Sequence, residues 1–307
     1  MRLYPKSLFV SLLVGVGLAT GVASDQKPAP SVTDDHRSAA TLLSVLDADT
    51  LPSPGVAIGI TSIDMQHNAS QGHQIATIPG SETVHFAWTM WDVIPDDYET
   101  TRFVNYNSWD KPSGSMNQGF NGTGVSLHEF ARGGYVRIDV NSDNLCQMTF
   151  HQRIEVASPY LAWYLYFPIE GSALHIDQEL IKNQQNPDEF EHVWPDVAIS
   201  RTPGGGVTDI SHVISDGTVN AGDGYPTPSD RISYWRYDWG APLPMWEGPV
   251  FVDSTRSISY VIHTDGDCGK VAIAFTSDYS TDGLNGVNNV VYRESHTAGT
   301  GWIDGTE

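Results

Sequence analysis

The stretch YVIHTDGDCGKVAIAFTSDYSTDGLNGVNNVVYRE (260–294) decides the fold class. It contains three short runs rich in Val, Ile, Tyr and Phe, which are YVIHT (260–264), VAIAFT (271–276) and VVYRE (290–294). Gly, Asp, Asn and Ser separate the runs, and apolar runs of this length between turn-forming residues predict β-strands. Because the connections are short, we expect the three strands to pair as an antiparallel meander.

Two of these runs have three counterparts each, in the same order along the chain. The first series is QIATI (74–78), YVRID (135–139), DVAIS (196–200) and YVIHT (260–264). The second series is VHFAW (84–88), MTFH (148–151), SHVIS (211–215) and VAIAFT (271–276). Equivalent positions are 75, 136, 197 and 261 in the first series, and 88, 151, 215 and 276 in the second. Both series therefore advance by roughly 60 residues per step, and a nearly constant step indicates an internal repeat.

A third series of runs follows the second, with less even spacing. Its members are FVNYN (103–107), ALHID (173–177), ISYWR (232–236) and VVYRE (290–294), and the first step is longer than the two that follow. We expect an outer fourth strand at GVSLHEF (124–130) in the first repeat and at GPVFVD (248–253) in the third. The fourth repeat is expected to lack one, because few residues follow its third strand.

The repeat predicts an all-β fold, and specifically a β-propeller of about four visible blades built from antiparallel meander sheets. Each such sheet buries its faces only against neighbouring sheets. A β-sandwich would not need the repeat, and a β-solenoid would have a shorter period. The segment GVAIGITSI (55–63) could close the ring as the missing outer strand. The alternative, which we favour because four blades are few for a closed ring, is a truncated piece of a larger, six-bladed propeller.

The N-terminal residues have the layout of a secretory signal peptide. Basic Arg2 and Lys6 precede an apolar stretch that is too short to span a membrane comfortably, and small residues end it near Ala23. We therefore expect a signal peptide at 1–24, a flexible polar leader at 25–53, and the propeller domain at 54–307. This organisation predicts a secreted, extracellular or periplasmic protein with no integral membrane segment after cleavage.

The charge of the chain limits its partners. Without Arg2 and Lys6 the 16 basic residues become 14, against 37 acidic residues. A surface this negative repels phosphates, so nucleic acid is excluded as a partner and an extracellular glycan or protein is expected. Cys146 and Cys268 could form one disulfide, but Cys146 lies in an apolar run where a buried free thiol is equally consistent.

A turn in the fourth repeat carries a family resemblance. Its sequence runs from Ser295 through Gly299 to Trp302, and it resembles the Asp-box pattern Ser-x-Asp-x-Gly-x-Thr-Trp, with Thr297 and Gly301 in place of Asp and Thr. A looser echo, Asp238-Trp-Gly240 followed by Trp246, lies in the third repeat. The chain thus resembles secreted bacterial proteins with sialidase-like propellers of the BNR or Asp-box type. The resemblance implies a tight turn whose Trp packs between blades, and it leaves the activity open.

The resemblance also implies what a sialidase would need. Such an enzyme has an arginine cluster, a Tyr paired with a Glu, and an acid–base Asp. Arg102, Arg236 and Arg293 lie on or beside third-series strands, where salt bridges on the surface or between blades are the plainer interpretation. Tyr292 and Glu294 are two apart on one strand and share a face.

Other binding candidates come from residue type alone. Histidines recur on second-series strands at His85, His151 and His212, although His151 has a different register. Isolated, partly buried histidines are the plainer interpretation. Aromatic residues at strand ends and in loops could stack on sugars or fill the space between blades. They are Trp88, Trp91, Trp109, Trp163, Tyr164, Trp235, Trp239 and Trp246.

No cofactor is expected, with calcium as the alternative. Asp265, Asp267 and Asp282 offer oxygen ligands on glycine-rich turns, although turn chemistry alone explains them equally well. The sequence therefore favours a secreted binding module whose candidate ligand is a glycan. The candidate binding residues are His85, His151, His212, Trp235, Arg236 and Arg293. The alternative is a sialidase-like glycoside hydrolase, which requires carboxyl groups to converge in one axial pocket.

Overall fold

The computed structural model places much of the C-terminal four-fifths of the chain. The described residues are 56–59, 61–62, 66, 72–91, 102–118, 124–127, 132–155, 159–180, 191–202, 208–218, 230–255, 259–266, 269–278 and 288–304. The chain divides into two units, 1–37 and 38–307, and all described residues belong to the second. The predicted signal peptide (1–24) and leader (25–53) lie outside the described residues.

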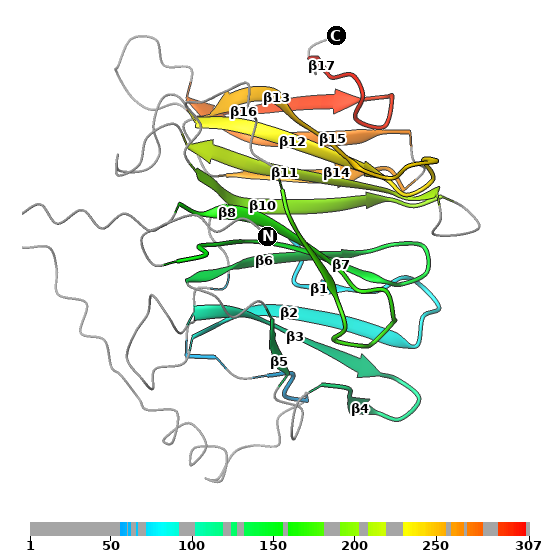
Figure 1. The fold of residues 1–307 in the computed structure, drawn as a ribbon. Helices are drawn as coiled ribbons and strands as arrows, with labels where there is room; N and C mark the ends of the chain where they lie inside the picture. The colour runs from blue at the N-terminus through cyan, green and yellow to red at the C-terminus, as the bar shows by residue number, and fades with distance from the viewer. Residues whose placement is uncertain are drawn as a thin grey trace, which may run out of the picture. The chain divides into compact units, whose positions relative to one another are not determined.

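Four antiparallel sheets make up the described fold (Figure 1). Sheet 1 contains β1 (Ile75–Ala76), β2 (Thr83–Trp91), β3 (Arg102–Asp110), β4 (Ser115–Met116) and β5 (Val125–Leu127), the last two both pairing with β3. Sheet 2 contains β6 (Gly133–Val140), β7 (Cys146–Gln152), β8 (Leu161–Tyr166) and β9 (Ile176–Glu179). Both sheets are meanders, as their short connections predict.

The second half of the chain repeats this arrangement. Sheet 3 contains β10 (Glu191–Ser200), β11 (Ile210–Thr218), β12 (Asp230–Asp238) and β13 (Trp246–Thr255). Sheet 4 contains β14 (Tyr260–Thr264), β15 (Val271–Asp278), β16 (Asn288–Ser295) and β17 (Ile303–Asp304). The first and second series of runs are confirmed as the first and second strands of all four sheets.

The third series is confirmed in sheets 1, 3 and 4 but is wrong in sheet 2. There the third strand is β8, with the sequence LAWYLY, and not ALHID (173–177). β8 pairs with β7 along its whole length and is almost fully buried, whereas β9 pairs only with β8 and is exposed. ALHID therefore leads into the outer strand. With β8 as the third strand of sheet 2, the longest step of the third series lies between sheets 2 and 3 rather than between sheets 1 and 2.

The prediction that the fourth repeat lacks an outer strand is also wrong. β17 pairs with β16 in sheet 4. The segment 55–63 does not replace it, because its described residues bind sheet 1: Asn107 Nδ2 donates to Ile58 O at 2.9 Å, and Ser62 N donates to Trp91 O at 3.2 Å. The outer strands predicted in sheets 1 and 3 are present as β5 and β13.

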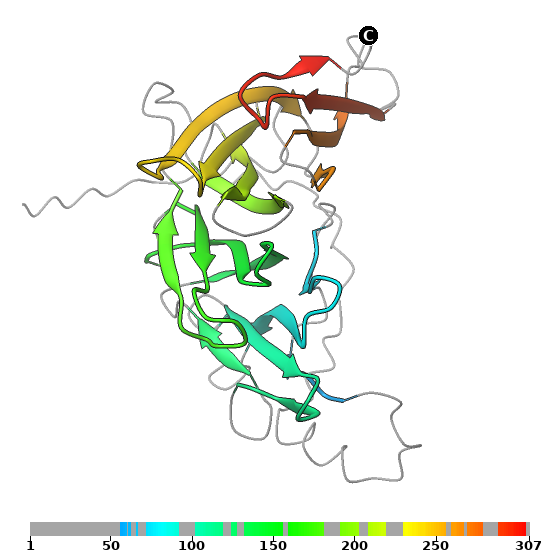
Figure 2. The ribbon, with the colours of Figure 1, turned by 90° about the vertical axis from the view of Figure 1, so that its right-hand side faces the viewer.

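The sheets pack on one another in chain order, which makes the fold a β-propeller. β6 lies against β1 and β2, β10 against β6, and β14 against β10, so the first strands are the innermost ones. In Figure 2 the sheets accordingly follow one another from cyan to red. Three apolar cores fill the spaces between sheets 1 and 2, 2 and 3, and 3 and 4.

Hydrogen bonds between innermost strands join successive sheets. Ile138 N of sheet 2 donates to His73 O beside sheet 1 at 2.8 Å. In sheet 3, Ile199 N donates to Asp139 Oδ2 of sheet 2, and in sheet 4, Ile262 N donates to Asp196 Oδ2 of sheet 3. Each junction thus has at least one polar link near the axis in addition to its apolar core. No helix among the described residues is long and apolar enough to cross a membrane.

Candidate axial site

A cavity of about 220 Å³ lies among the innermost strands. Residues from or next to the first strand of every sheet line it, among them His73, Asp139, Arg201, His263, Thr264 and Asp265. Binding sites of propellers can form on this axis because the blades surround a central channel. The cavity is smaller than the roughly 300–1,000 Å³ that drug-sized ligands occupy, so it suits a single small ring.

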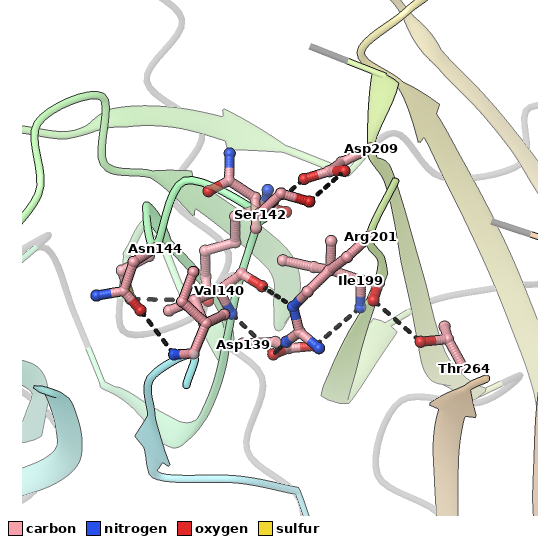
Figure 3. A network of polar contacts seen from close by, with 12 residues as sticks. Asp139, Val140, Ser142, Asn144, Ile199, Arg201, Asp209 and Thr264 are labelled. Carbon is pink, nitrogen blue, oxygen red and sulfur yellow. Dashed lines mark hydrogen bonds and ion pairs between the residues drawn. The ribbon is translucent and has the colours of Figure 1, made fainter. Parts of the chain in front are cut away.

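Asp139 and Arg201 form the ion pair at the centre of this site (Figure 3). Asp139 Oδ1 pairs with Arg201 Nη2 and accepts a hydrogen bond from Val140 N at 2.8 Å. Its Oδ2 accepts from Ile199 N at 2.9 Å, and Arg201 Nε donates to Val140 O at 2.7 Å. Burial raises the pKa of the Asp139 carboxyl, while Arg201 and the two amides oppose that shift.

Side chains around this pair tie sheets 1 to 4 together. Asp209 accepts hydrogen bonds from the backbone N and the hydroxyl of Ser142 at 2.7 and 2.8 Å, which links sheets 3 and 2. Asn144 Oδ1 accepts from Ile78 N at 3.0 Å and so reaches sheet 1. Thr264 Oγ1 donates to Ile199 O at 3.0 Å and joins sheet 4 to sheet 3 (Figure 3). The site therefore has a rigid base.

Three polar residues of the cavity remain exposed. They are His73, which precedes β1, His263 on β14, and Asp265, which follows β14. Together with Arg201, whose side chain is one-third exposed, they offer both hydrogen-bond donors and acceptors. A ligand with several hydroxyl groups can use both kinds.

A second buried carboxyl lies between the innermost strands. Asp196 on β10 is only 2% exposed, and its Oδ2 accepts a hydrogen bond from Ile262 N at 3.3 Å. Burial raises its pKa to about 6, opposed by the nearby Arg137 guanidinium. Since its oxygens receive the amides of Val197 and Ile262, its visible role is to join sheets 3 and 4.

The structure places His85 and His212 in equivalent buried positions of sheets 1 and 3. Nδ1 of His85 bonds Tyr106 OH at 2.7 Å, and Nδ1 of His212 bonds Tyr234 OH at 2.6 Å. Burial lowers their pKa values to about 4 and about 3, respectively. Each imidazole is therefore neutral at pH 7, and its second nitrogen is bonded too, to Asn144 O or to the Ser200 hydroxyl.

His151 lies in a separate environment in sheet 2. Its Nδ1 accepts a hydrogen bond from Trp194 N at 3.0 Å, and its ring packs against Tyr135 and Tyr160. Burial, followed by repulsion from Arg102 and other arginines, lowers its pKa well below the usual value. The three candidate histidines thus belong to three different sheets, and each is enclosed by its own local partners.

Arg236 and Arg293 both bind across the junction of sheets 3 and 4. Arg236 donates to Ala298 O at 2.9 Å and forms an ion pair with Asp238 at 2.7 Å. Arg293 donates from Nε and Nη2 to Asp253 Oδ2 at 2.8 and 2.6 Å. Arg293–Asp253 is thus an ion pair between blades, whereas Arg236 pairs with Asp238 of its own sheet and reaches sheet 4 only through Ala298 O.

Arg102 and Trp235 are buried, at different junctions. Arg102 donates to Gly133 O at 2.5 Å and lies over the Tyr135 ring of sheet 2. Trp235 packs edge-on against His192 inside the core between sheets 2 and 3, so it offers no exposed ring for stacking.

Half-buried aromatic rings gather where the ends of β8 and β12 and the start of β13 meet, between sheets 2 and 3. Trp239 packs against Tyr166 and Tyr237, with ring centroids 4.5 and 4.7 Å apart. Trp246 packs against Tyr237 and Tyr164, and its Nε1 donates to Gln178 Oε1 at 2.6 Å. These contacts are the filling between blades that the sequence left as one of two alternatives.

Only one of the three candidate calcium ligands is among the described residues. Asp265 is described and exposed, whereas Asp267 and Asp282 lie outside the described residues. Among the described residues no three His, Cys, Asp or Glu side chains cluster as a metal would require. Cys146 is a buried free thiol, and Cys268 lies outside the described residues.

Sequence reasoning missed most residues of the axial cavity. Of the lining residues the sequence indicates only Asp265, as a candidate calcium ligand. A usable pattern exists, because Asp139, Arg201 and Asp265 each end or closely follow a first-series run. In a propeller the first strands are innermost, so polar residues at equivalent ends of these strands meet at the axis.

No family model matches the chain, and no curated protein matches it. Several solved structures are similar to parts of the chain at low identity. An α-L-arabinofuranosidase from Podospora anserina, solved with cellotriose, is 10% identical with a TM-score of 0.37, covering 81% of this chain and 71% of that one. A thermostable family-43 glycoside hydrolase is 10% identical with a TM-score of 0.43, covering 76% and 74%. An endo-arabinase from Bacteroides thetaiotaomicron is 12% identical with a TM-score of 0.39, covering 76% and 78%. None of these three is a sialidase, and none is similar enough to transfer an activity.

Proposed function

We propose that this chain is a secreted glycan-binding β-propeller whose axial cavity holds one sugar residue of a neutral glycan. The observation that carries the proposal is the chemistry of the cavity, where exposed His73, His263 and Asp265 surround the fixed Asp139–Arg201 pair. A sugar hydroxyl donates one hydrogen bond and accepts others, so it needs this mixture of groups. A volume of about 220 Å³ fits a single ring rather than an extended ligand.

Charge supports a neutral ligand. The chain carries a formal net charge of −21, which opposes the approach of anionic polymers. Within the cavity the Arg201 charge is already balanced by Asp139, so it is not available as a free anion site. The imidazoles of His73 and His263 can bond hydroxyl groups without requiring a charged ligand.

Calorimetric titration with neutral oligosaccharides, including cellotriose and arabinohexaose, tests the proposal. We expect one of them to bind, and His263→Ala and Asp265→Asn each to weaken binding about tenfold, as loss of one or two hydrogen bonds predicts. Asp177→Asn, at an exposed aspartate on β9 outside the cavity, is the matched control and should bind normally. Binding that survives both cavity substitutions would contradict the proposed site.

Hydrolysis is the second candidate function, because Asp139 and Asp265 line the same cavity. Glycosidases use a pair of carboxyl groups in one site, one of them with a raised pKa, and burial raises the pKa of Asp139. Measuring reducing sugar released from the same oligosaccharides distinguishes the two functions. Release by the unmodified protein that Asp265→Asn abolishes, with binding retained, would establish the enzyme. Sialidase activity is a more specific form of this hydrolase hypothesis, and hydrolysis of a fluorogenic sialoside tests it.

Secretion is part of the proposal and rests on the N-terminal sequence. Expression of the full chain in a secreting host should yield an extracellular or periplasmic product. N-terminal sequencing of that product should begin at or near Asp25 if the signal peptide at 1–24 is cleaved as expected. Retention of the intact N-terminus inside the cell would contradict this part alone.

A further inference from the structure

The imidazole of His151, on β7, has one nitrogen that serves no bond in the described part of the chain. His151 is 2% exposed, and its Nδ1 accepts a hydrogen bond from Trp194 N at 3.0 Å. Because Nδ1 accepts, it carries no proton, and the proton of the neutral ring is on Nε2. Nε2 has no hydrogen-bond partner among the described residues. A buried donor of this kind indicates a ligand that offers an acceptor atom.

Four arginines gather around this imidazole. They are Arg102, Arg132, Arg137 and Arg153, and after burial they are the groups that lower the pKa of His151. Arg102 begins β3 of sheet 1, whereas the other three lie on or beside β6 and β7 of sheet 2. The chain has a formal net charge of −21, so composition does not predict such a concentration of positive charge.

The ring of Tyr160 holds two of these arginines beside the histidine. The guanidinium carbon of Arg153 lies 4.2 Å from the centroid of this ring, and that of Arg132 lies 6.0 Å from it. Tyr160 in turn packs on the imidazole of His151, with ring centroids 4.6 Å apart. A guanidinium over a ring has five N–H groups in its own plane, so it can bind a ligand in addition to its protein partners.

Two irregular positions of the innermost strands bring Tyr135 and Trp194 to the same histidine. Their φ angles are +56° and +48°, a region that bulky residues rarely adopt, and each lies at a shift of register in β6 or β10. Their rings lie 5.3 and 5.9 Å from the imidazole of His151, and Arg102 lies over Tyr135 at 5.3 Å. Bulges and backbone strain of this kind concentrate at functional sites, where they re-aim side chains.

Two carboxylates lie beside the arginines. Asp196 opposes the effect of burial on the pKa of Arg137, so this arginine already has a counter-charge. Glu191 Oε1 accepts a hydrogen bond from Tyr160 N at 3.2 Å. The remaining arginines, with the histidine, make up the cluster that we call the His151 site. Its members are His151, Arg102, Arg132 and Arg153.

The His151 site is separate from the axial cavity. Tyr135 and Trp194 lie near the starts of β6 and β10, whereas Asp139 and Arg201 of the cavity lie at or just beyond the ends of the same strands. The two ends of the innermost strands therefore carry different chemistry, a mixture of donors and acceptors at one end and donors alone at the other.

We propose that the His151 site binds an oxyanion group, as in a sulfate or a carboxylate. A guanidinium and an Nε2–H group only donate hydrogen bonds, and the oxygens of these anions only accept them. A neutral hydroxyl would find no acceptor for its own hydrogen at these nitrogens. The net charge of −21 opposes a densely charged polymer, but a single oxyanion is affected mainly by charges within about 8 Å at physiological ionic strength.

Calorimetric titration of the mature exported protein with sodium sulfate, at constant ionic strength, tests the proposal. We expect one ion to bind, and Arg132→Met and Arg153→Met each to raise the dissociation constant about tenfold, as loss of a charge-assisted hydrogen bond predicts. Methionine keeps an unbranched side chain over Tyr160. Arg231→Met is the matched control, since Arg231 lies over the Phe251 ring at 5.9 Å in sheet 3. The control should bind normally, and unchanged far-UV circular dichroism shows that all three variants are folded.

Parallel titrations with glucose 6-sulfate, glucuronate and glucose show where the oxyanion comes from. Tighter binding of a charged sugar than of free sulfate would identify an acidic sugar as the ligand, and equal binding would identify the free ion. Either result supports the site if Arg153→Met weakens it. Binding of uncharged glucose should not respond to Arg153→Met, and an equal response of glucose and glucose 6-sulfate would overturn the proposal.

Nitrogen NMR at pH 7 locates the ion within the protein. His151 should show a protonated Nε2 whose resonance shifts as sulfate is added, while the resonances of His212 stay unchanged. No binding at about 20 mM sulfate, a dissociation constant that neither Arg132→Met nor Arg153→Met changes, or an unshifted His151 would each overturn the proposal. Loss of sulfate binding in His263→Ala would place the ion in the axial cavity, which also overturns it and leaves the proposed glycan site untouched.

Discussion

The free energy of unfolding of the His212→Gln variant should decrease by about 2 kcal/mol less between pH 7 and pH 5 than that of the unmodified protein. His212 is fully buried, and burial lowers its pKa from 6.5 to about 3. The unfolded chain therefore takes up a proton near pH 6.5 that the folded protein takes up only near pH 3. A depressed folded pKa means that the neutral form contributes stability above pH 6.5, and that this stability is lost as the pH falls toward 3.

The size of the effect follows from the two pKa values. Between pH 7 and pH 5 the linkage amounts to about 2 kcal/mol for His212. His85, whose pKa is lowered to about 4, contributes a similar amount over the same interval. Together the two histidines should cost the protein about 4 kcal/mol of stability on acidification to pH 5, a large share of the roughly 5–15 kcal/mol that is typical.

Glutamine is the informative replacement because sheet 2 already uses it. Gln147 occupies the equivalent position there, and its Oε1 accepts the hydrogen bond from Tyr164 OH at 2.7 Å. In the His212→Gln variant the new side chain should accept from Tyr234 OH in the same way without titrating. The fold is therefore expected to persist while the pH dependence decreases.

Urea unfolding at pH 7 and pH 5, on the unmodified protein and on His212→Gln, measures the difference directly. The variant should lose about 2 kcal/mol less between the two pH values than the unmodified protein. His296→Gln, at a histidine that is half exposed, is the matched control and should leave the difference nearly unchanged. Equal pH dependence of the unmodified protein and His212→Gln, to within about 0.5 kcal/mol, would refute the assignment of His212 as a buried neutral imidazole.

Two further substitutions test the junction of sheets 3 and 4. Gly299→Ala should destabilise the protein by about 3 kcal/mol or more, because Gly299 has a φ of +85° and an added Cβ would overlap Tyr234 Oη. Gly266→Ala, with the same φ but open space, should cost about 1 kcal/mol, and equal losses in thermal unfolding would contradict the steric argument. Arg293→Ala should cost about 1–3 kcal/mol through the partly buried pair with Asp253, and the loss should be absent when Asp253→Ala is already present.

Most strands could be predicted from the sequence because they are covered on one or both faces, with β9, exposed at all four residues, as an exception. Thus β7, with the sequence CQMTFHQ, is buried at every position between sheets 1 and 3, and β14 alternates between buried and exposed residues. The error in sheet 2 arose because periodicity alone cannot show which of two apolar runs pairs with a middle strand. LAWYLY and ALHID are both plausible strands, and only the pairing with β7 distinguishes them.

The candidate site could not be predicted from residue type for a similar reason. His85, His151 and His212 have the chemistry of ligands, yet each is enclosed within its own sheet. Asp139 and Arg201 are 62 positions apart, and nothing in their local sequence indicates an ion pair. Their meeting depends on how successive innermost strands lie side by side.

The sequence by itself determined most of the strands, the repeat and the acidic character of this protein. Strands follow from β-propensity and turn residues that lie close together in the chain, and the repeat and the net charge are read from the sequence without knowing which residues meet in space. The tertiary structure decided which tyrosines are covered, which carboxyls are buried, and which polar residues share the axial cavity. Those properties depend on the packing of one sheet against the next. Tyr234 and Tyr292 occupy equivalent positions, yet Tyr234 is buried because sheet 4 packs against it, whereas Tyr292 lies on the other face of sheet 4 and is exposed.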